Sequence, residues 1–385
     1  MYKCKRCGNI DQTYFYKGHK GIYCRKCVSF KRILLEEEPK DIKYEISENV
    51  SEYNFEYPLT PFQKDASNKC LKYLKEGDVL LKAVCGAGKT EIVVDSISYY
   101  LNKKLRVCYA IPRREVVIEL SKRFEKIFPK AKVVALYGGH HDEIVGDLIV
   151  CTVHQLFRYY KTFDLLILDE VDAYPLANNN ELLNIALNSN KGHIIFSTAT
   201  VNDFLKNILN KRKYKEVDLY VRPSLKPLII PKVFISFEPI LFIYLFILMK
   251  KSDKQHIVFV SNKKLCYLLY RIYKIFFSCT YVYAELEDRN KNIDDFKNKK
   301  YQFIFSTTVL ERGITIKDIN VIIINLNKNV FDEGSLIQML GRVGRNYHNP
   351  YGEAYILSKY RDVEIKKAIS YLREANRKYE MSLLR

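Results

Sequence analysis

The sequence predicts an α/β protein in which two parallel-sheet lobes follow a small cysteine-bearing module. Short apolar runs typical of β-strands alternate with helical stretches from Leu59 onward, a pattern that favours parallel sheets. Three prolines between 223 and 231 mark a seam in that region, and the 385 residues exceed what one compact core usually holds. We therefore expect a finger at 1–32, an acidic linker at 33–58, and lobes at 59–222 and 232–385.

The chain carries a formal net charge of +19, which favours a polyanionic partner such as nucleic acid. Its richness in Lys, Asn, Ile and Tyr is also what an AT-rich genome would encode, so charge alone does not identify the partner. The polar start of the sequence leads us to expect no signal peptide, and the apolar run 239–249 is far shorter than the roughly 20 residues that span a bilayer. We expect this run to form a buried helix of a cytoplasmic protein, with membrane contact as the lesser alternative.

Four of the ten cysteines form two Cys-x2-Cys pairs, and the other six are scattered as in proteins of a reducing cytosol. Sixteen residues separate the pairs, which fits a four-thiolate zinc site. Each pair aims two thiolates at one ion, and two pairs complete a tetrahedron. Iron in the same site, or a redox pair, is the alternative. The expected zinc ligands are Cys4, Cys7, Cys24 and Cys27.

The residues around these cysteines predict two further features. Tyr, Phe and Gly residues at 14–23 indicate a small hairpin between the cysteine pairs. Segment 1–32 carries nine Lys or Arg residues against a single acid, Asp11, which suits contact with nucleic acid. From 33 to 58 the balance reverses to eight acids against two lysines, and we expect a solvated linker there.

A strand, a glycine loop and a helix start follow one another at 79–90. The apolar run Val79–Cys85 leads into a variant P-loop that has Ala83 where the strict pattern has glycine. Backbone N–H groups and the helix dipole would hold the phosphates of ATP, Lys89 would reach the terminal phosphates, and Thr90 would bind Mg²⁺. The expected nucleotide-binding residues here are Gly86, Ala87, Gly88, Lys89 and Thr90.

A second apolar run, Phe163–Leu168, ends in two acids. We expect Asp169 to hold Mg²⁺ through water and Glu170 to orient and deprotonate the attacking water. A plain acidic turn is the alternative, which the upstream P-loop disfavours. Asp172 is expected to link this site to the hydroxyl cluster at Ser197–Thr200, where hydrolysis would be coupled to movement between the lobes.

Two glutamines are expected near the nucleotide. Gln63 lies twenty residues before Ala83 and could read the adenine edge through paired hydrogen bonds. An ordinary surface Gln that opens a helix is an equally good interpretation of this residue. Gln338 opens the last motif of the second lobe.

Several loops lie where a strand of nucleic acid would cross the lobes. Backbone amides at helix starts, together with Thr and Arg side chains, suit phosphate contacts without base readout. In the first lobe helix capping alone would explain these loops equally well. Gly313 belongs to the second-lobe motif that is expected to connect nucleic-acid contact to ATP. The residues expected at nucleic acid are Pro112, Arg113, Gly139, Thr152, His154, Thr307 and Arg312.

The second half repeats the strand-and-helix alternation without a second P-loop. Strand-like runs are expected at 256–260, 279–284, 302–306, 320–325 and 352–357. Arg342 and Arg345 are three residues apart, so we expect them on one face of a helix, where they would stabilise charge on the γ-phosphate. Salt bridges on a helix surface are the alternative.

The order of these motifs resembles that of superfamily-two helicases, in which two RecA-like lobes bind ATP. The motifs are AVCGAGKT at 83–90, DEVD at 169–172, STAT at 197–200, STTVLERG at 306–313 and QMLGRVGR at 338–345. The preceding four-cysteine module and DEVDAYP at 169–175 narrow the resemblance to the ComFA late-competence family, although Tyr174 stands where Phe is more usual and Val28 where a glycine would follow the second cysteine pair.

This resemblance implies a zinc-containing, DNA-dependent ATPase of the cytoplasm that binds single-stranded DNA and associates with the membrane. It also implies a role in drawing transforming DNA through the uptake channel together with a ComFC-like partner. Direction of travel, unwinding of duplex and self-association stay open.

Three other functions are less favoured. A replication-restart or repair helicase of the PriA or RecG kind would carry further DNA-binding domains, for which we expect no room here. The last motif of DEAD-box RNA helicases usually begins with His. A non-catalytic DNA-binding scaffold would be expected to have lost one of Lys89, Glu170 and Arg345.

Overall fold

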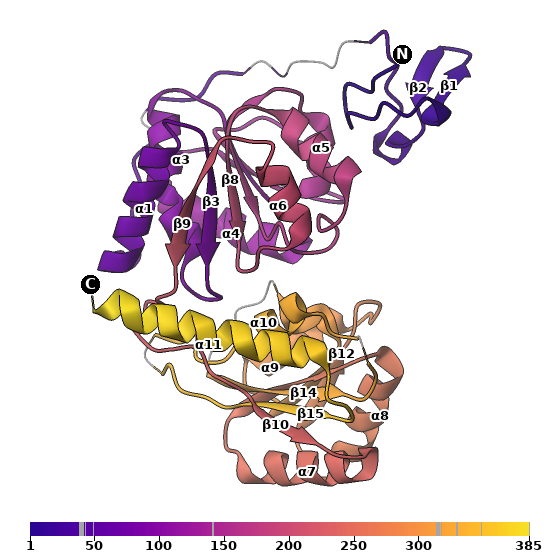
Figure 1. Ribbon diagram of the computed structural model, residues 1–385, viewed down its shortest axis with the longest axis vertical. Helices are drawn as coiled ribbons and strands as arrows, with labels where there is room; N and C mark the ends of the chain where they lie inside the picture. The colour runs from indigo at the N-terminus through magenta and orange to yellow at the C-terminus, as the bar shows by residue number, and fades with distance from the viewer. Residues whose placement is uncertain are drawn as a thin grey trace. The chain divides into compact units, whose positions relative to one another are not determined.

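The chain forms two compact units in the computed structural model (Figure 1). The first consists of 1–83 with 88–219, and the second of 84–87 with 220–385. The structure describes residues 1–37, 42, 44–48, 50–140, 142–312, 316, 318–328, 330–347 and 349–384. Gly313 and part of the predicted acidic linker lie outside these residues.

The first unit opens with the cysteine-bearing finger. Strands β1 (Phe15–Gly18) and β2 (Gly21–Cys24) pair antiparallel, which confirms the predicted hairpin. Short 3₁₀ turns precede and follow it, η1 (Gln12–Tyr14) and η2 (Val28–Phe30). The second cysteine pair thus lies between the end of the hairpin and the turn η2.

A seven-stranded parallel sheet forms the centre of the first unit, in the order β5-β6-β4-β7-β8-β3-β9. Its strands are β3 (Asp78–Ala83), β4 (Val107–Ile111), β5 (Val133–Leu136), β6 (Leu148–Thr152), β7 (Phe163–Asp169), β8 (Asn190–Thr198) and β9 (Tyr214–Leu219). Strands β4 and β6 are buried at every residue, as expected of a parallel sheet covered on both faces.

Helices cover both faces of this sheet because right-handed crossovers run in both directions from its centre. In Figure 1, α1 and α3 flank the sheet on one side, and α5 and α6 on the other. The helical elements of this part are α1 (Pro61–Tyr73), α2 (Lys89–Ile92), α3 (Val94–Asn102), α4 (Arg114–Ile127), η3 (Val153–Arg158), α5 (Asn180–Ser189) and α6 (Asp203–Leu209).

The described part of the predicted acidic linker packs against the first unit, so the expectation of a solvated linker is wrong there. Ile46 and Val50 are buried. The backbone N–H of Ser47 donates to the Asp147 carboxylate at 2.8 Å. Apolar side chains at a spacing of four residues among the acids explain the difference, because they can be buried while the acids remain in water.

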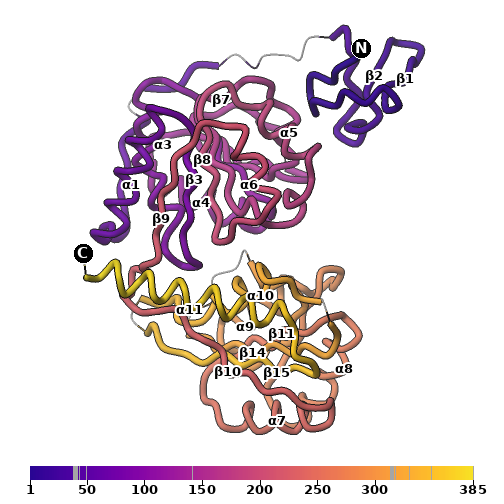
Figure 2. The backbone as a smooth tube through the Cα atoms, viewed as in Figure 1, coloured from indigo at the N-terminus to yellow at the C-terminus, as the bar shows by residue number. Residues whose placement is uncertain are grey.

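The second unit is built on a six-stranded parallel sheet in the order β10-β15-β14-β11-β13-β12. Figure 2 traces the backbone of this unit. Its strands are β10 (Lys232–Ile235), β11 (Gln255–Val260), β12 (Cys279–Val282), β13 (Phe303–Ser306), β14 (Ile319–Asn325) and β15 (Ala354–Ser358). All five strand-like runs of the second lobe are therefore confirmed, with no end shifted by more than two residues. The helical elements are α7 (Glu238–Lys251), α8 (Lys263–Tyr273), α9 (Arg289–Lys297), η4 (Thr308–Glu311), α10 (Glu333–Leu340) and α11 (Val363–Leu383).

The seam expected between the lobes falls between the edge strand β9, which ends at Leu219, and β10, which begins at Lys232. The prolines at the seam lie between these two strands, which agrees with their poor fit to a sheet interior.

Helix α7 contains the apolar run 239–249 and is buried on one face only. Leu241 and Leu245 are fully buried, whereas Ile243 is 60% exposed and Ile247 is 39% exposed. The expectation of a buried helix is therefore wrong for the outer face. Among the described residues, no helix is long and apolar enough to cross a membrane.

The two faces of α7 give a direct test of this packing. Leu245→Ala should lower the free energy of unfolding by roughly 2–5 kcal/mol, because it leaves a cavity in the core of the second unit. Ile243→Ala, on the exposed face of the same helix, should change it by less than about 0.5 kcal/mol. Urea unfolding followed by circular dichroism measures both, and equal losses would contradict the assigned faces.

Candidate nucleotide-binding site and four-cysteine centre

The glycine loop between β3 and α2 has the backbone geometry that the sequence predicts. Gly86 and Gly88 adopt φ values of 81° and 85°, which few residues other than glycine tolerate. A Cβ on Gly88 would approach the side-chain nitrogen of Gln63 to 2.3 Å, so a larger residue at 88 would also have to displace this amide. Lys89 and Thr90 follow as the first residues of α2.

Asp169, the last residue of β7, is the centre of this site in the first unit. Its carboxylate is buried and forms an ion pair with Lys89 at 3.2 Å between Nζ and Oδ1. The hydroxyl groups of Tyr109 and Ser197 donate to its two oxygens, each at 2.7 Å. A carboxylate is costly to bury without such partners. The same arrangement places the Asp169 carboxylate next to the ammonium group of Lys89.

The parallel strands explain why these side chains meet. Asp169 on β7 lies opposite Ser197 on β8, and β8 is also paired with β3, which leads into the glycine loop. Burial, followed by the nearby Asp169 charge, raises the pKa of Tyr109 well above its usual value. Tyr109 therefore remains a protonated donor to the carboxylate at neutral pH.

Glu170 follows Asp169 in a left-handed backbone conformation, with φ of 53°. Such a conformation is costly for a residue with a side chain and is typically retained at functional sites. Its backbone N–H donates to Asp169 at 2.9 Å, so the turn fixes the positions of both acids.

Asp172 is joined to the hydroxyl cluster after β8, as predicted. Thr198 donates to one of its carboxylate oxygens at 2.7 Å and Thr200 donates to the other at 2.9 Å. The backbone N–H of Thr200 in turn donates to the Thr198 hydroxyl at 3.1 Å. Through Ser197 and Thr198, a single strand end is thus hydrogen-bonded to both Asp169 and Asp172.

Gln63 lies in the first turn of α1 and is buried, so it is not the ordinary surface residue of the alternative interpretation. It forms a capping box with Thr60: its backbone N–H donates to the Thr60 hydroxyl at 3.3 Å, and the Thr60 N–H donates to Gln63 Oε1 at 3.0 Å. Its amide nitrogen meanwhile lies beside Gly88. Gln63 therefore caps α1 and also lies beside the phosphate loop.

The loops predicted to contact nucleic acid lie at different strand ends of the first unit. Arg113 and Thr152 are the capping positions of α4 and η3, yet neither uses its side chain to cap the helix. Gly139 lies in a turn with φ of 81°, in open space. Desolvation lowers the pKa of His154, so its imidazole is neutral at pH 7. Pro112 directly precedes Arg113. Contact of these residues with nucleic acid remains a prediction.

The arginine pair of the second unit differs from the expected geometry. Helix α10 ends at Leu340, so Arg342 lies in the turn after it and Arg345 directly follows that turn; neither is on a helix face. The turn ends at Gly344, whose φ of 70° cannot continue a helix. Gln338, within α10, is buried.

Glu311 organises the neighbouring motif in the same unit. Its side chain pairs with Arg312 at 3.2 Å, and its backbone carbonyl accepts from Nε of Arg342 at 3.1 Å. Arg312 and Arg342 are both buried, so Arg342 does not lie on a helix surface as its alternative interpretation required. Thr307 precedes η4 as its capping residue.

Arg222 is a buried residue that the motif analysis missed. Its guanidinium donates to the backbone carbonyls of Gly341 at 3.0 Å and Val343 at 2.8 Å, within the turn that carries the arginine pair. Burial, and then the charge of Arg345, lowers the pKa of Arg222 to about 10. No local pattern in the sequence distinguishes this arginine from the other basic residues near the seam.

The four predicted metal ligands are brought together in the finger. Their sulfur atoms all lie within 4.8 Å of one another, and each residue is buried. The Cys4–Cys27 and Cys7–Cys24 sulfur distances are 3.7 and 3.8 Å. Zn–S bonds of about 2.3 Å place the corners of a tetrahedron about 3.8 Å apart, so the donor set fits a single tetrahedral zinc ion.

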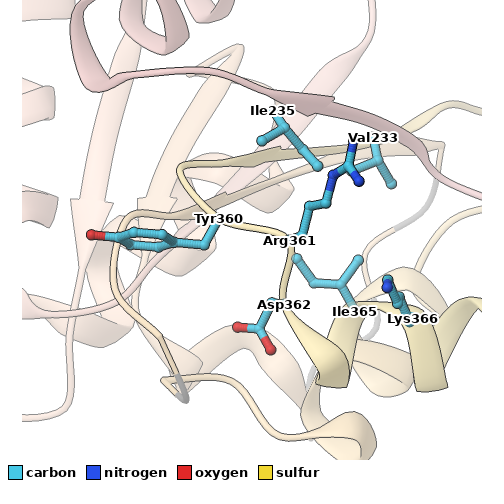
Figure 3. A pocket seen from close by; sticks show the side chains of 7 residues that line it. All are labelled: Val233, Ile235, Tyr360, Arg361, Asp362, Ile365 and Lys366. Atoms are coloured by element: carbon cyan, nitrogen blue, oxygen red, sulfur yellow. The ribbon is translucent and has the colours of Figure 1, made fainter.

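A pocket of about 220 Å³ in the second unit lies apart from all of these residues (Figure 3). The side chains of Val233 and Ile235 on edge strand β10, together with Ile365 at the start of α11, form its apolar part. None of the predicted site residues lines it, and we assign it no role in nucleotide binding.

The fold and the site define a two-lobed ATPase of the helicase class. Residues 60–208 match the family model for the DEAD/DEAH box helicase, and residues 239–347 match that for the helicase conserved C-terminal domain. The competence protein ComFA of Streptococcus pneumoniae is 32% identical over 97% of this chain and 90% of its own length. ComFA of Bacillus subtilis is 30% identical over 92% of this chain and 81% of its own length. The chain belongs to the ComFA family.

Solved structures show the same fold at low identity. Yeast Dbp5 bound to RNA and ADP BeF3 has a TM-score of 0.59 and 18% identity, covering 82% of this chain and 91% of that one. The Mycobacterium smegmatis helicase Lhr bound to ssDNA and AMP-PNP has a TM-score of 0.61 and 16% identity, and the match covers 84% of this chain and 49% of the Lhr chain. At these identities the likeness concerns the fold alone.

Metal analysis tests the four-cysteine centre. The purified protein should contain about one zinc ion per chain, and Cys24→Ser should reduce this severalfold because it removes one ligand of the tetrahedron. Cys70→Ser, which replaces a buried cysteine of α1, should keep the full content. Elemental analysis by mass spectrometry provides the measurement, and either iron in place of zinc or equal loss in both variants would contradict the assignment.

Proposed function

We propose that this protein is a single-stranded-DNA-dependent ATPase that translocates along the strand and so drives uptake of transforming DNA. Its membership of the ComFA family supports the role in competence. The observation that carries the ATPase part is the cluster at the glycine loop in which half-buried Lys89 joins the buried residues Asp169, Tyr109 and Ser197. A ComFC-like protein and the uptake channel at the inner membrane face are the proposed partners.

The residues of the first unit fit Mg²⁺ and the phosphates of ATP. Lys89, now paired with Asp169, would turn to the terminal phosphates, and the Asp169 carboxylate would then be available to the cation together with the Thr90 hydroxyl. Tyr109 and Ser197 keep the carboxylate in place during this exchange. Bound Mg²⁺ would neutralise phosphate charge.

The remaining catalytic groups have narrower proposed roles. Glu170, fixed by its left-handed backbone, would orient the attacking water and accept its proton. Arg342 and Arg345 of the second unit are the proposed stabilisers of charge on the γ-phosphate. Asp172, with Thr198 and Thr200, would couple hydrolysis to movement between the lobes.

Steady-state ATP hydrolysis by the zinc-loaded protein tests this function. Single-stranded DNA should stimulate hydrolysis more than duplex DNA or RNA does. Lys89→Ala should reduce the stimulated rate by about a hundredfold or more, because it removes a charge that stabilises the transferred phosphoryl group. Lys82→Ala, on the preceding strand and paired with Glu216 and Asp218, should stay within about twofold of wild type.

The outcomes separate the alternatives. Stimulation by RNA alone would replace the proposal with an RNA-dependent motor, and a preference for duplex or branched DNA would favour a repair helicase. Absence of hydrolysis with every nucleic acid would favour a binding scaffold.

A further inference from the structure

Within the first unit, the finger is docked against the part built on the seven-stranded sheet, through contacts near both of its cysteine pairs. On the side of the first pair, the amide of Asn188 on α5 donates to the backbone carbonyls of Lys5 at 3.2 Å and Arg6 at 2.7 Å. Lys5 and Arg6 are the two residues between Cys4 and Cys7. The path of this backbone, and so the position of both carbonyls, is set by the cysteines that flank it.

The second cysteine pair leads to an aromatic contact. Cys27 is the residue before η2, and Phe30 ends that turn. The Phe30 ring stacks against His154 with centroids 6.1 Å apart and lies 5.8 Å from Phe157, both on η3. The finger therefore contacts the rest of the first unit through η3, the segment that follows the predicted nucleic-acid residue Thr152.

Arg6 connects the two parts of this interface. Its guanidinium lies 5.7 Å above the Phe157 ring and donates to the backbone carbonyl of Phe30 at 2.9 Å. An ion pair between Lys26 and Glu181, at 2.9 Å, adds a contact at the start of α5. The buried cysteines and the core of the first unit form a single cluster, with Phe30 and Phe157 packed against it.

We propose that the metal-loaded finger positions the η3 segment for single-stranded nucleic acid, with Phe30 and Asn188 as positioning residues. The inference rests on the proposed function, and it assigns the finger a role in binding affinity beyond folding itself. Phe30 supports the ring of His154 from one side, and the basic surface of the finger extends the path of the strand beyond Thr152. Both effects require the finger to be held against η3, and a finger attached only through its linker would produce neither.

Two variants of the full-length, zinc-loaded protein test the proposal: Phe30→Ala and Asn188→Ala. Each should retain one zinc ion per chain, yet raise the dissociation constant for a fluorescent oligo-dT by roughly fivefold to tenfold, the size of a moderate coupling between sites. Amide hydrogen exchange across 153–158 should become faster, while ATP hydrolysis without nucleic acid stays unchanged. Phe30→Tyr keeps the ring and should restore the affinity.

Matched controls separate docking from general disturbance. Tyr16→Ala removes an exposed finger aromatic that packs against Tyr23 and Arg25 within the finger. Asn180→Ala changes an exposed residue in the first turn of α5. Both should keep wild-type affinity and exchange.

Each result has a distinct meaning. An unchanged dissociation constant in the two zinc-loaded variants would overturn the positioning role, and unchanged exchange as well would identify the finger as an independent module. If the wild-type protein fails to bind oligo-dT, the proposed function fails, whereas faster exchange across 153–158 in both variants would still demonstrate the docked finger.

Discussion

The buried carboxylate of Asp169 is the feature on which the rest of the first unit depends. A carboxylate removed from water is costly unless cations and hydrogen-bond donors surround it, and here one ammonium group and two hydroxyl groups do so. The parallel register of β7 and β8, with β3 next to β8, brings these groups to one edge of the sheet. The same edge is where open α/β sheets ordinarily bind their ligands.

The hydrogen bonds continue from this carboxylate along the end of β8. Ser197 bonds to Asp169, and the next residue, Thr198, bonds to Asp172, so the end of this one strand is tied to both acids. In the second unit, Arg222 holds the carbonyls of the turn that presents the arginine pair. Both arrangements fix backbone positions through buried polar groups, which tolerate displacement poorly.

Much of the architecture follows from local sequence. Apolar β-runs alternating with helices predict parallel sheets, and the glycines at 86 and 88 predict a loop in which only residues without a Cβ fit. Cys4, Cys7, Cys24 and Cys27 likewise indicate their own proximity, because each pair forms a knuckle. These signals are readable because each depends on residues close together in the chain.

The features that the sequence did not reveal depend on distant contacts. Ile46 and Val50 are buried although acids surround them, and Ile243 is exposed although it lies within the apolar run 239–249. Arg342 and Arg345 were expected on a helix that in fact ends before them. The docking of Phe30 on η3 joins segments more than 120 residues apart, and no spacing rule reports such a contact.

The most direct test of the account is the Mg²⁺ dependence of nucleotide binding at Asp169. Isothermal titration with a non-hydrolysable ATP analogue should show one site per wild-type chain, with an affinity that falls when Mg²⁺ is withheld. Asp169→Ala should lose this dependence, whereas Asp164→Ala, near the opposite end of the same strand, should retain it. Equal Mg²⁺ dependence in Asp169→Ala and wild type would contradict the central role of this carboxylate.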